Sequence, residues 1–196
     1  MFLPPLRLRL RQSAAGALLL SGFLVLFGLT VTLSFKPRHE PAAVVGPGGH
    51  AVLNTPLDEP MFSDAQILEL AGAWAEDCQT YGFADYQSRL EGTCRGHFTD
   101  TAFSAYTDAL RVSGRIHAIV SNFALQTAHY KSPGVVIRKE INSDATYQWT
   151  VQIPVQETIL NDAHHYDRSS MVELQLVRQS PAVSLPPIAI TGWIER

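Results

Sequence analysis

The sequence predicts an α+β domain, with helices first and an antiparallel sheet after them, behind a single N-terminal membrane-spanning helix. Three observations predict this arrangement. The chain carries no charge from Gln12 to Phe35. Beyond Ser63, apolar residues recur at every third or fourth position, as on one face of a helix. After about residue 123 apolar and polar residues alternate, as in a half-buried strand. Helices followed by consecutive strands are typical of α+β domains.

The predicted membrane helix covers residues 14–35. A bilayer core about 30 Å thick needs roughly 20 apolar helical residues, which this segment supplies. A cleavable signal peptide is the alternative, but its apolar part would be shorter and would end at small residues, whereas "SFKPRHE" follows here. Residues 1–13 form a short basic tail with three arginines, which favours a cytoplasmic N-terminus. We therefore expect a single-pass protein of a bacterial inner membrane with its C-terminal domain in the periplasm.

The charge balance argues against nucleic-acid binding. All 18 Asp and Glu residues lie beyond residue 35, together with all but three of the 15 Lys and Arg residues. A nucleic-acid-binding surface needs the opposite sign, clustered on one face. We expect no direct contact with nucleic acid.

Residues 36–62 are expected to form a periplasmic linker. They contain five prolines and three glycines, which oppose any regular element through the segment. The segment is either a flexible tether or includes a short extended piece at "HAVLN". The periplasmic α+β domain is expected to occupy residues 63–196.

About three helices are expected at the start of that domain. Ser63 and Gln66 have the spacing of a capping box. An apolar stripe follows, and "FADYQSRLEGTC" is expected to form a second, shorter helix. Thr99 or Asp100 is positioned to cap a third helix, and "RIHAIVSNFA" adds another turn or leads into a strand. The stripe of the first helix comprises Ile67, Leu70, Ala71, Trp74, Cys78 and Tyr81.

Four strands are expected after these helices. The clearest is "TYQWTVQIPVQ", in which the residues from Tyr147 to Val155 alternate between an apolar and a polar face. Pro154 lies on the polar face and indicates an edge or a bulge. The other three expected strands are "PGVVIRKEI", "MVELQLV" and "IAITGWIE".

The chain has two cysteines, Cys78 and Cys94, and they lack the spacing of a metal site or a redox pair. In an oxidising periplasm a disulfide is favoured, closing a loop of about 17 residues and adding roughly 3 kcal/mol in the chain-entropy model. Two buried, unpaired thiols are the alternative.

Other chemistry is weakly indicated. His164 and His165, with Asp162 and Asp167, could bind a metal ion but more often such a segment is a solvated loop. His117 is expected to be packed. The sequence contains no serine nucleophile elbow, phosphate-binding loop or zinc-protease motif. We therefore predict no catalytic, cofactor-binding or metal-binding residues, and no cofactor.

Several segments in order resemble the DotI/IcmL family, which includes IncI-type TraM proteins of conjugation systems. The resemblance covers about residues 53–196. Its most specific parts are the aromatic-Asp-Tyr segment with Phe83, Asp85 and Tyr86, then "HFT", "ALRVSG", "YQWTVQIPV" and "LVR". One departure is visible, because the family tends to have "GW" after the Phe-Thr pair; we expect Phe103 to fill the place of that tryptophan.

The resemblance implies a nuclear-transport-factor-2-like cone, with helices packed into a curved antiparallel sheet of about four strands. It also implies a scaffold or channel component of a type IVB-like secretion or conjugation system, without catalysis. Its partners would be further copies of itself and other inner-membrane secretion subunits. The alternative is a membrane-anchored periplasmic enzyme or small-ligand-binding domain, which a polar residue pointing into the cone would favour. Cys78–Cys94 would pin the second helix to the first, with Tyr81, Phe83 and Tyr86 seated in the core.

Overall fold

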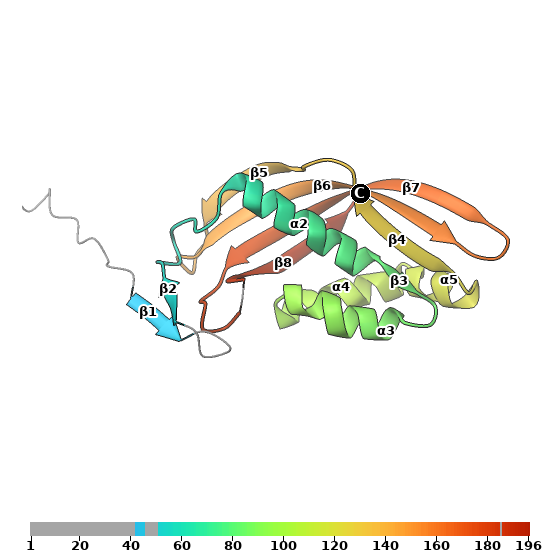
Figure 1. The fold of residues 1–196 in the computed structure, drawn as a ribbon, viewed down its shortest axis with the longest axis horizontal. Helices are drawn as coiled ribbons and strands as arrows, with labels where there is room; N and C mark the ends of the chain where they lie inside the picture. Colours follow the sequence, from blue (N-terminus) through green and yellow to red (C-terminus); the bar gives the residue numbers. More distant parts are fainter. Residues whose placement is uncertain (1–41, 46–50, 185) are drawn as a thin grey trace, which may run out of the picture. The chain divides into compact units, whose positions relative to one another are not determined.

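The computed structural model describes residues 42–45, 51–184 and 186–196 (Figure 1). The predicted basic tail, residues 1–13, and the predicted membrane helix, residues 14–35, lie outside these ranges. Within them no helix is both long and apolar enough to cross a membrane. The described domain is α+β with a curled antiparallel sheet, and most of its helices come before the strands, as predicted.

Helix α2 (Asp64–Gln79) begins at the predicted capping box. Oγ of Ser63 accepts a hydrogen bond from N–H of Gln66, whose Oε1 in turn accepts one from N–H of Ser63. The apolar stripe faces the core, where Ile67 and Ala71 are fully buried. The helix ends earlier than the stripe suggests, because the backbone becomes extended at Thr80 and Tyr81 then starts the short strand β3 (Tyr81–Gly82).

The second predicted helix is a series of short turns of different pitch. Helix α3 (Tyr86–Ser88) continues into the π-helical turn η1 (Arg89–Cys94) and the 3-10 turn η2 (Arg95–His97). Helix α4 (Asp100–Val112) begins after Thr99, as predicted.

Helix α5 (Arg115–Ser121) follows Gly114, whose φ of 73° lies in the left-handed region that glycine adopts without strain. It is the additional helical turn expected from "RIHAIVSNFA". His117, expected to be packed, is exposed on it.

The main sheet has more strands than predicted. Its order is β3–β4–β6–β7–β8, with β5 also paired to β6, and every pairing of consecutive strands is antiparallel. Four of these strands were predicted, whereas β3 and β4 were not. The strands other than β3 are β4 (Leu125–Tyr130), β5 (Val135–Ile141), β6 (Tyr147–Leu160), β7 (His165–Arg178) and β8 (Ile188–Glu195).

Strands β4 and β5 follow each other along one edge of β6. Tyr130 of β4 pairs with Val155, and Val135 of β5 pairs with Gln152, so Pro154 has no partner on this side. The predicted local edge at Pro154 is therefore present. Because no strand pairs with Pro154 on this side, the absence of its N–H costs the sheet no hydrogen bond. Gly134 lies at the same break, where an added Cβ would be 2.1 Å from the carbonyl oxygen of Gln152.

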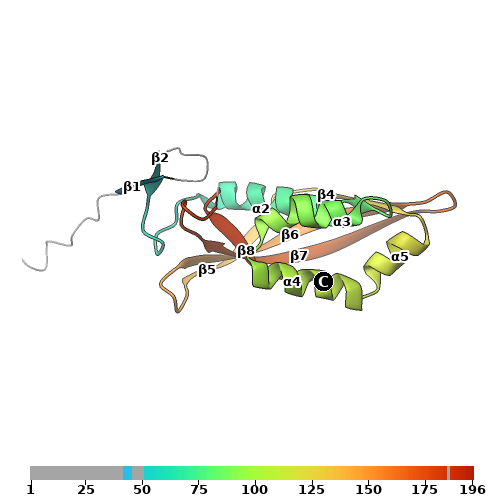
Figure 2. The same ribbon diagram turned by 90° about the horizontal axis from the view of Figure 1, so that it is seen from below.

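The core lies between α2 and the sheet (Figures 1 and 2). The predicted inward faces of β6 and β7 are buried, and Tyr147, at the start of β6, is only half-buried. Phe103 of α4 is buried against Phe98, so it does occupy the core. The buried inward residues of the two strands are Trp149, Val151, Ile153, Val155, Val172, Leu174 and Leu176.

The segment predicted to be a linker contains the short extended piece that was one of its two expected forms. Strands β1 (Ala42–Val45) and β2 (Ala51–Asn54) form a two-stranded antiparallel ladder, and β2 includes most of "HAVLN". The following residues bind to the domain, because Arg178 donates to the carbonyl oxygens of Thr55 and Glu59, both at 3.1 Å. Burial lowers the pKa of Arg178, although its side chain keeps both hydrogen bonds to the incoming chain.

Candidate functional site

The two cysteines lie together in the core. Cys78 on α2 and Cys94 at the end of η1 are fully buried, with Cα atoms 4.8 Å apart and sulfur atoms at bonding distance. Tyr81 is buried and Tyr86 packs against the core, but Phe83 is 44% exposed, contrary to expectation. Its ring contacts Phe123 edge-on instead. The disulfide stays a prediction that thiol counting tests.

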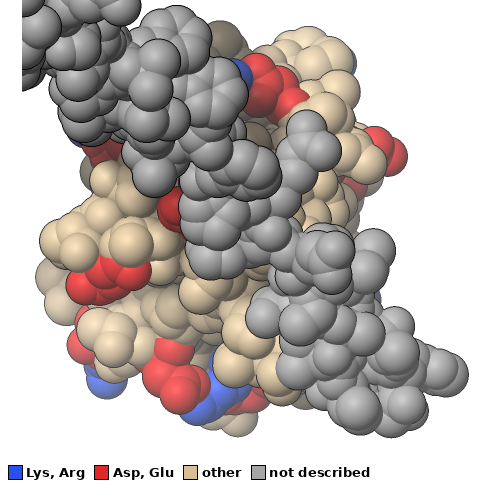
Figure 3. Space-filling view, turned by 90° about the vertical axis from the view of Figure 1, so that its left-hand side faces the viewer, with Lys and Arg blue, Asp and Glu red and all other residues tan. Residues whose placement is uncertain are grey.

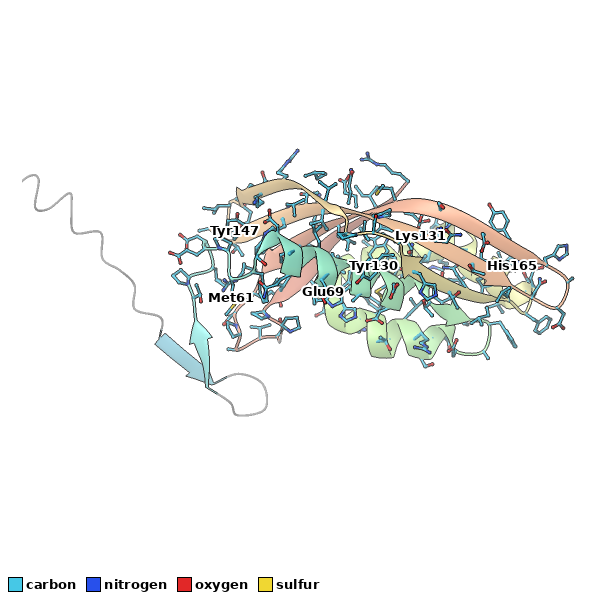
Figure 4. All side chains as sticks on the ribbon, turned by 45° about the horizontal axis from the view of Figure 1, so that its top comes forward. Met61, Glu69, Tyr130, Lys131, Tyr147 and His165 are labelled. Atoms are coloured by element: carbon cyan, nitrogen blue, oxygen red, sulfur yellow. A yellow bond between two sulfur atoms is a disulfide. The ribbon has the colours of Figure 1, made fainter. Side chains whose placement is uncertain are left out.

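The histidines do not form a metal site in the described residues. His165 contacts Asp167 at 3.3 Å near the turn between β6 and β7 (Figure 4). His97 contacts Asp77 at 3.0 Å and stacks on Trp74. Across residues 51–184 and 186–196, no three His, Cys, Asp or Glu side chains are grouped so that they could share an ion.

A buried charged cluster, which was not predicted, lies where the inward faces of the strands become polar. We call Arg115, Glu157, Arg168 and Glu195 the charged cluster. Glu157 follows Val155 on the inward face of β6 and is fully buried. Arg168 is its register partner on β7, and Arg115 and Glu195 come from α5 and β8.

The two carboxylates share the guanidinium of Arg168. Its Nη2 lies 2.9 and 2.8 Å from the two oxygens of Glu157 and 2.7 Å from Oε1 of Glu195. Arg115 donates to Glu195 at 2.5 Å. Ser170 donates to Glu157 at 3.0 Å. Charge-assisted hydrogen bonds of this kind are stronger than neutral ones, so the cluster ties α5 to three strands.

The cluster changes the electrostatics of its neighbours. Burial raises the pKa of the Tyr81 hydroxyl to about 12, although the nearby Arg115 opposes the shift. Burial also acts to lower the pKa of Arg115, but the hydrogen bond to Glu195 and the charges of both glutamates outweigh it and raise that pKa. Both groups therefore keep their protons at neutral pH.

Two cavities have both of these arginines in their linings. The first, of about 420 Å³, is lined by α5 and by the inward residues near the turn between β6 and β7. The second, of about 470 Å³, is lined by α4, the middle of β7 and the end of β8. Their linings include no histidine or cysteine. The arrangement can therefore bind and orient a polar group through its two arginines.

A signal for Glu157 was present in the sequence. The period-two alternation that places Tyr147 to Val155 inward also places Glu157 inward when it is extended by one more step. The inward face is apolar over Trp149 to Val155, as expected, and it becomes charged one step beyond the predicted alternation.

Comparisons with known proteins agree with this architecture. The periplasmic domain of DotI matches with a TM-score of 0.66 at 23% identity, covering 70% of this chain and 98% of that one. A periplasmic fragment of TraM gives 0.63 at 23% identity, covering 69% and 98%. An IcmL-like type IV secretion system protein from Legionella pneumophila gives 0.60 at 18% identity, covering 69% and 93%. At these identities the likeness shows the fold alone.

No curated protein matches the sequence. A family model described as "Type-IV b secretion system, inner-membrane complex component" matches residues 18–196. This match spans most of the chain, so the chain belongs to the DotI/IcmL family of type IVB secretion systems.

Proposed function

We propose that this chain is a structural, non-catalytic subunit of the inner-membrane complex of a type IVB-like secretion or conjugation system. The family match over residues 18–196 is the observation that carries the proposal. The filled core supports it, because α2 and the apolar faces of β6 and β7 occupy the interior along most of the sheet. On the face in Figure 3, Asp and Glu side chains cover more of the described surface than Lys and Arg, so that face favours protein contacts over nucleic acid.

The proposed topology is a single span at residues 14–35 with a cytoplasmic tail and a periplasmic domain. The solved DotI and TraM relatives are themselves periplasmic domains, which supports this orientation. Protease added to spheroplasts should then digest residues 63–196 and spare an N-terminal tag. Digestion of the tag without disruption of the membrane would contradict the proposed topology.

The proposed partners are further copies of this chain and other inner-membrane secretion subunits. The test is gentle detergent extraction of the tagged full-length protein from its own host, with native sizing and mass spectrometry of the proteins that co-purify. An equally tagged single-span protein of unrelated function is the control. A large particle containing other secretion subunits is the expected result, and recovery as a lone monomer would overturn the scaffold role.

A second candidate function, a periplasmic ligand-binding domain or enzyme, is favoured by one observation. The inward face becomes charged at Glu157, beside two cavities that present Arg115 and Arg168. Binding of a ligand is compatible with the scaffold role.

A further inference from the structure

The cavity beside α5 has two arginines and no carboxylate in its lining. Arg115 and Arg168 line it, and no Asp or Glu does. Glu157 and Glu195 pair with these arginines from outside the lining, and Glu157 is fully buried, whereas the side chains of Arg115 and Arg168 are 18% and 36% exposed. A ligand in the cavity therefore meets guanidinium groups before it meets carboxylates. This lining is complementary to an anionic group.

The arginines have donors to spare. In its hydrogen bonds within the charged cluster Arg168 uses only Nη2, and its buried Nε has no partner in the structure. Arg115 likewise hydrogen-bonds through Nη2 to Glu195. Because a guanidinium carries five N–H donors in a planar fork, each arginine can donate to a ligand carboxylate and keep its hydrogen bonds to the glutamates.

The same cavity contains an orphaned acceptor. Gln126 lines it and is fully buried, and its Nε2 donates to the carbonyl oxygen of Gln79 at 2.8 Å. That bond fixes the orientation of the amide, and Oε1 is left without a partner. Buried acceptors are normally satisfied, and Oε1 is itself closed to solvent, so it accepts an N–H from a ligand only when the amide of Gln126 turns toward the cavity.

Apolar surface completes the lining and its rim. Ile119 and Ile159 lie inside the cavity, and Tyr166, 57% exposed, stands at its side. Next to it, Phe123 is 70% exposed and has a φ of 50°, a left-handed conformation that is costly for an aromatic residue. This conformation ends α5, because N–H of Ala124 donates to the carbonyl oxygen of Ile119, and it leaves the ring of Phe123 exposed beside the cavity.

The cavity lies at the far end of the sheet from the incoming chain. Leu57 accepts a hydrogen bond from N–H of Tyr147, whereas the cavity is beside the turn that precedes His165 (Figure 4). The strand between these ends has 14 residues, which at about 3.3 Å per residue spans about 45 Å. A partner bound in this cavity would therefore lie far from the point where the chain enters the domain.

We propose that this cavity binds the C-terminal residue of a partner polypeptide within the secretion complex. A single C-terminal residue supplies all three complementary groups: a carboxylate for Arg115 and Arg168, an amide N–H for Oε1 of Gln126, and an apolar side chain for Ile119 and Ile159. Its class is an apolar residue such as leucine with a free carboxylate. The identity of the partner as a secretion subunit rests on the proposed function, whereas the peptide specificity does not.

The first test uses the unaltered full-length protein in mild detergent. The probe is Gly-Ser-Ala-Leu with a fluorophore on its N-terminal amine, compared by anisotropy with the same labelled peptide as a C-terminal amide. We expect the free carboxylate to bind at least tenfold more tightly than the amide. Equal binding of the two peptides, or no binding of either, overturns the proposal.

A blocking variant then connects the cavity to the complex. Ala118→Trp places a large side chain on an exposed position of α5 that lines the cavity, and His117→Trp is the matched control on an exposed position outside the lining. We expect Ala118→Trp to weaken peptide binding at least tenfold and His117→Trp to change it less than twofold. Circular dichroism of both variants checks that the fold is retained.

Co-purification from the host separates the two proposals. Loss of one specific secretion subunit with Ala118→Trp, and not with His117→Trp, supports the inference. Retention of every subunit despite lost peptide binding overturns the assignment of the ligand to the complex and leaves the scaffold role intact. If the unaltered protein recovers no secretion subunit, the proposed function fails, whatever the peptide result.

Discussion

Replacement of Glu157 by glutamine tests whether the charged cluster stabilises the domain. The change keeps the size of the side chain but removes its charge and places an amide against Nη2 of Arg168, which now contacts both oxygens within 2.9 Å. Breaking a buried ion pair costs about 3–5 kcal/mol. Because Arg168 is 36% exposed and keeps Glu195 at 2.7 Å, we expect the lower end, about 3 kcal/mol. For a domain of this size that loss lowers the Tm by about 6–12 °C.

The measurement is thermal unfolding of the full-length protein in mild detergent, followed by near-ultraviolet circular dichroism. Glu140→Gln is the matched control, because Glu140 is 44% exposed and lies 3.8 Å from an exposed arginine. Exposed pairs of this kind contribute less than about 1 kcal/mol. If Glu157→Gln lowers the Tm no more than Glu140→Gln does, the cluster does not stabilise the fold and the reasoning is refuted.

Three further predictions concern the disulfide, the Tyr81 hydroxyl and Gly134. Cys78→Ser should cost about 3 kcal/mol by the chain-entropy model, and non-reducing mass spectrometry should find no free thiol in the unaltered periplasmic protein; two free thiols would contradict the disulfide. The pKa of Tyr81 is raised to about 12 in the folded protein, whereas the unfolded chain loses this proton near pH 10. The contribution of Tyr81 to the free energy of unfolding is therefore fully present below pH 10. It falls by about 1.4 kcal/mol per pH unit from pH 10 to about pH 12. Tyr81→Phe should make the fall shallower by about 1.4 kcal/mol per pH unit, whereas Tyr106, whose pKa burial also raises, keeps its own contribution. A profile as steep as that of the unaltered protein would count against the role of Tyr81. Gly134→Ala should cost about 2 kcal/mol in denaturant unfolding, because the new Cβ meets the carbonyl oxygen of Gln152, whereas Gly96→Ala has open space and should not show this cost.

The parts of the fold that the sequence predicts are those where local chemistry and burial agree. Ser63 and Gln66 form the expected capping box, and the four apolar strands form where alternation is strong. Strand β4 was missed because its inward positions include Gln126 and Ala128, which give no apolar alternation. A side chain of α2 supplies a hydrogen bond to the backbone of β4 instead, since Glu76 accepts one from N–H of Tyr130. Tertiary contacts of that kind leave no periodic signal.

The charged cluster escaped prediction for a related reason. The polar segment between β6 and β7 suggests a long loop, yet the two strands continue through it to a turn after Leu160. Once Leu160 is paired with His165, antiparallel register alone pairs Glu157 with Arg168, so this half of the cluster follows from the position of one turn. Arg115 and Glu195 cannot be placed in that way, because the first depends on how α5 packs and the second on a register shift between β7 and β8. A site that binds polar groups on the inward face of a strand interrupts the alternation of apolar and polar residues. A strand with this interruption is then predicted to be a loop.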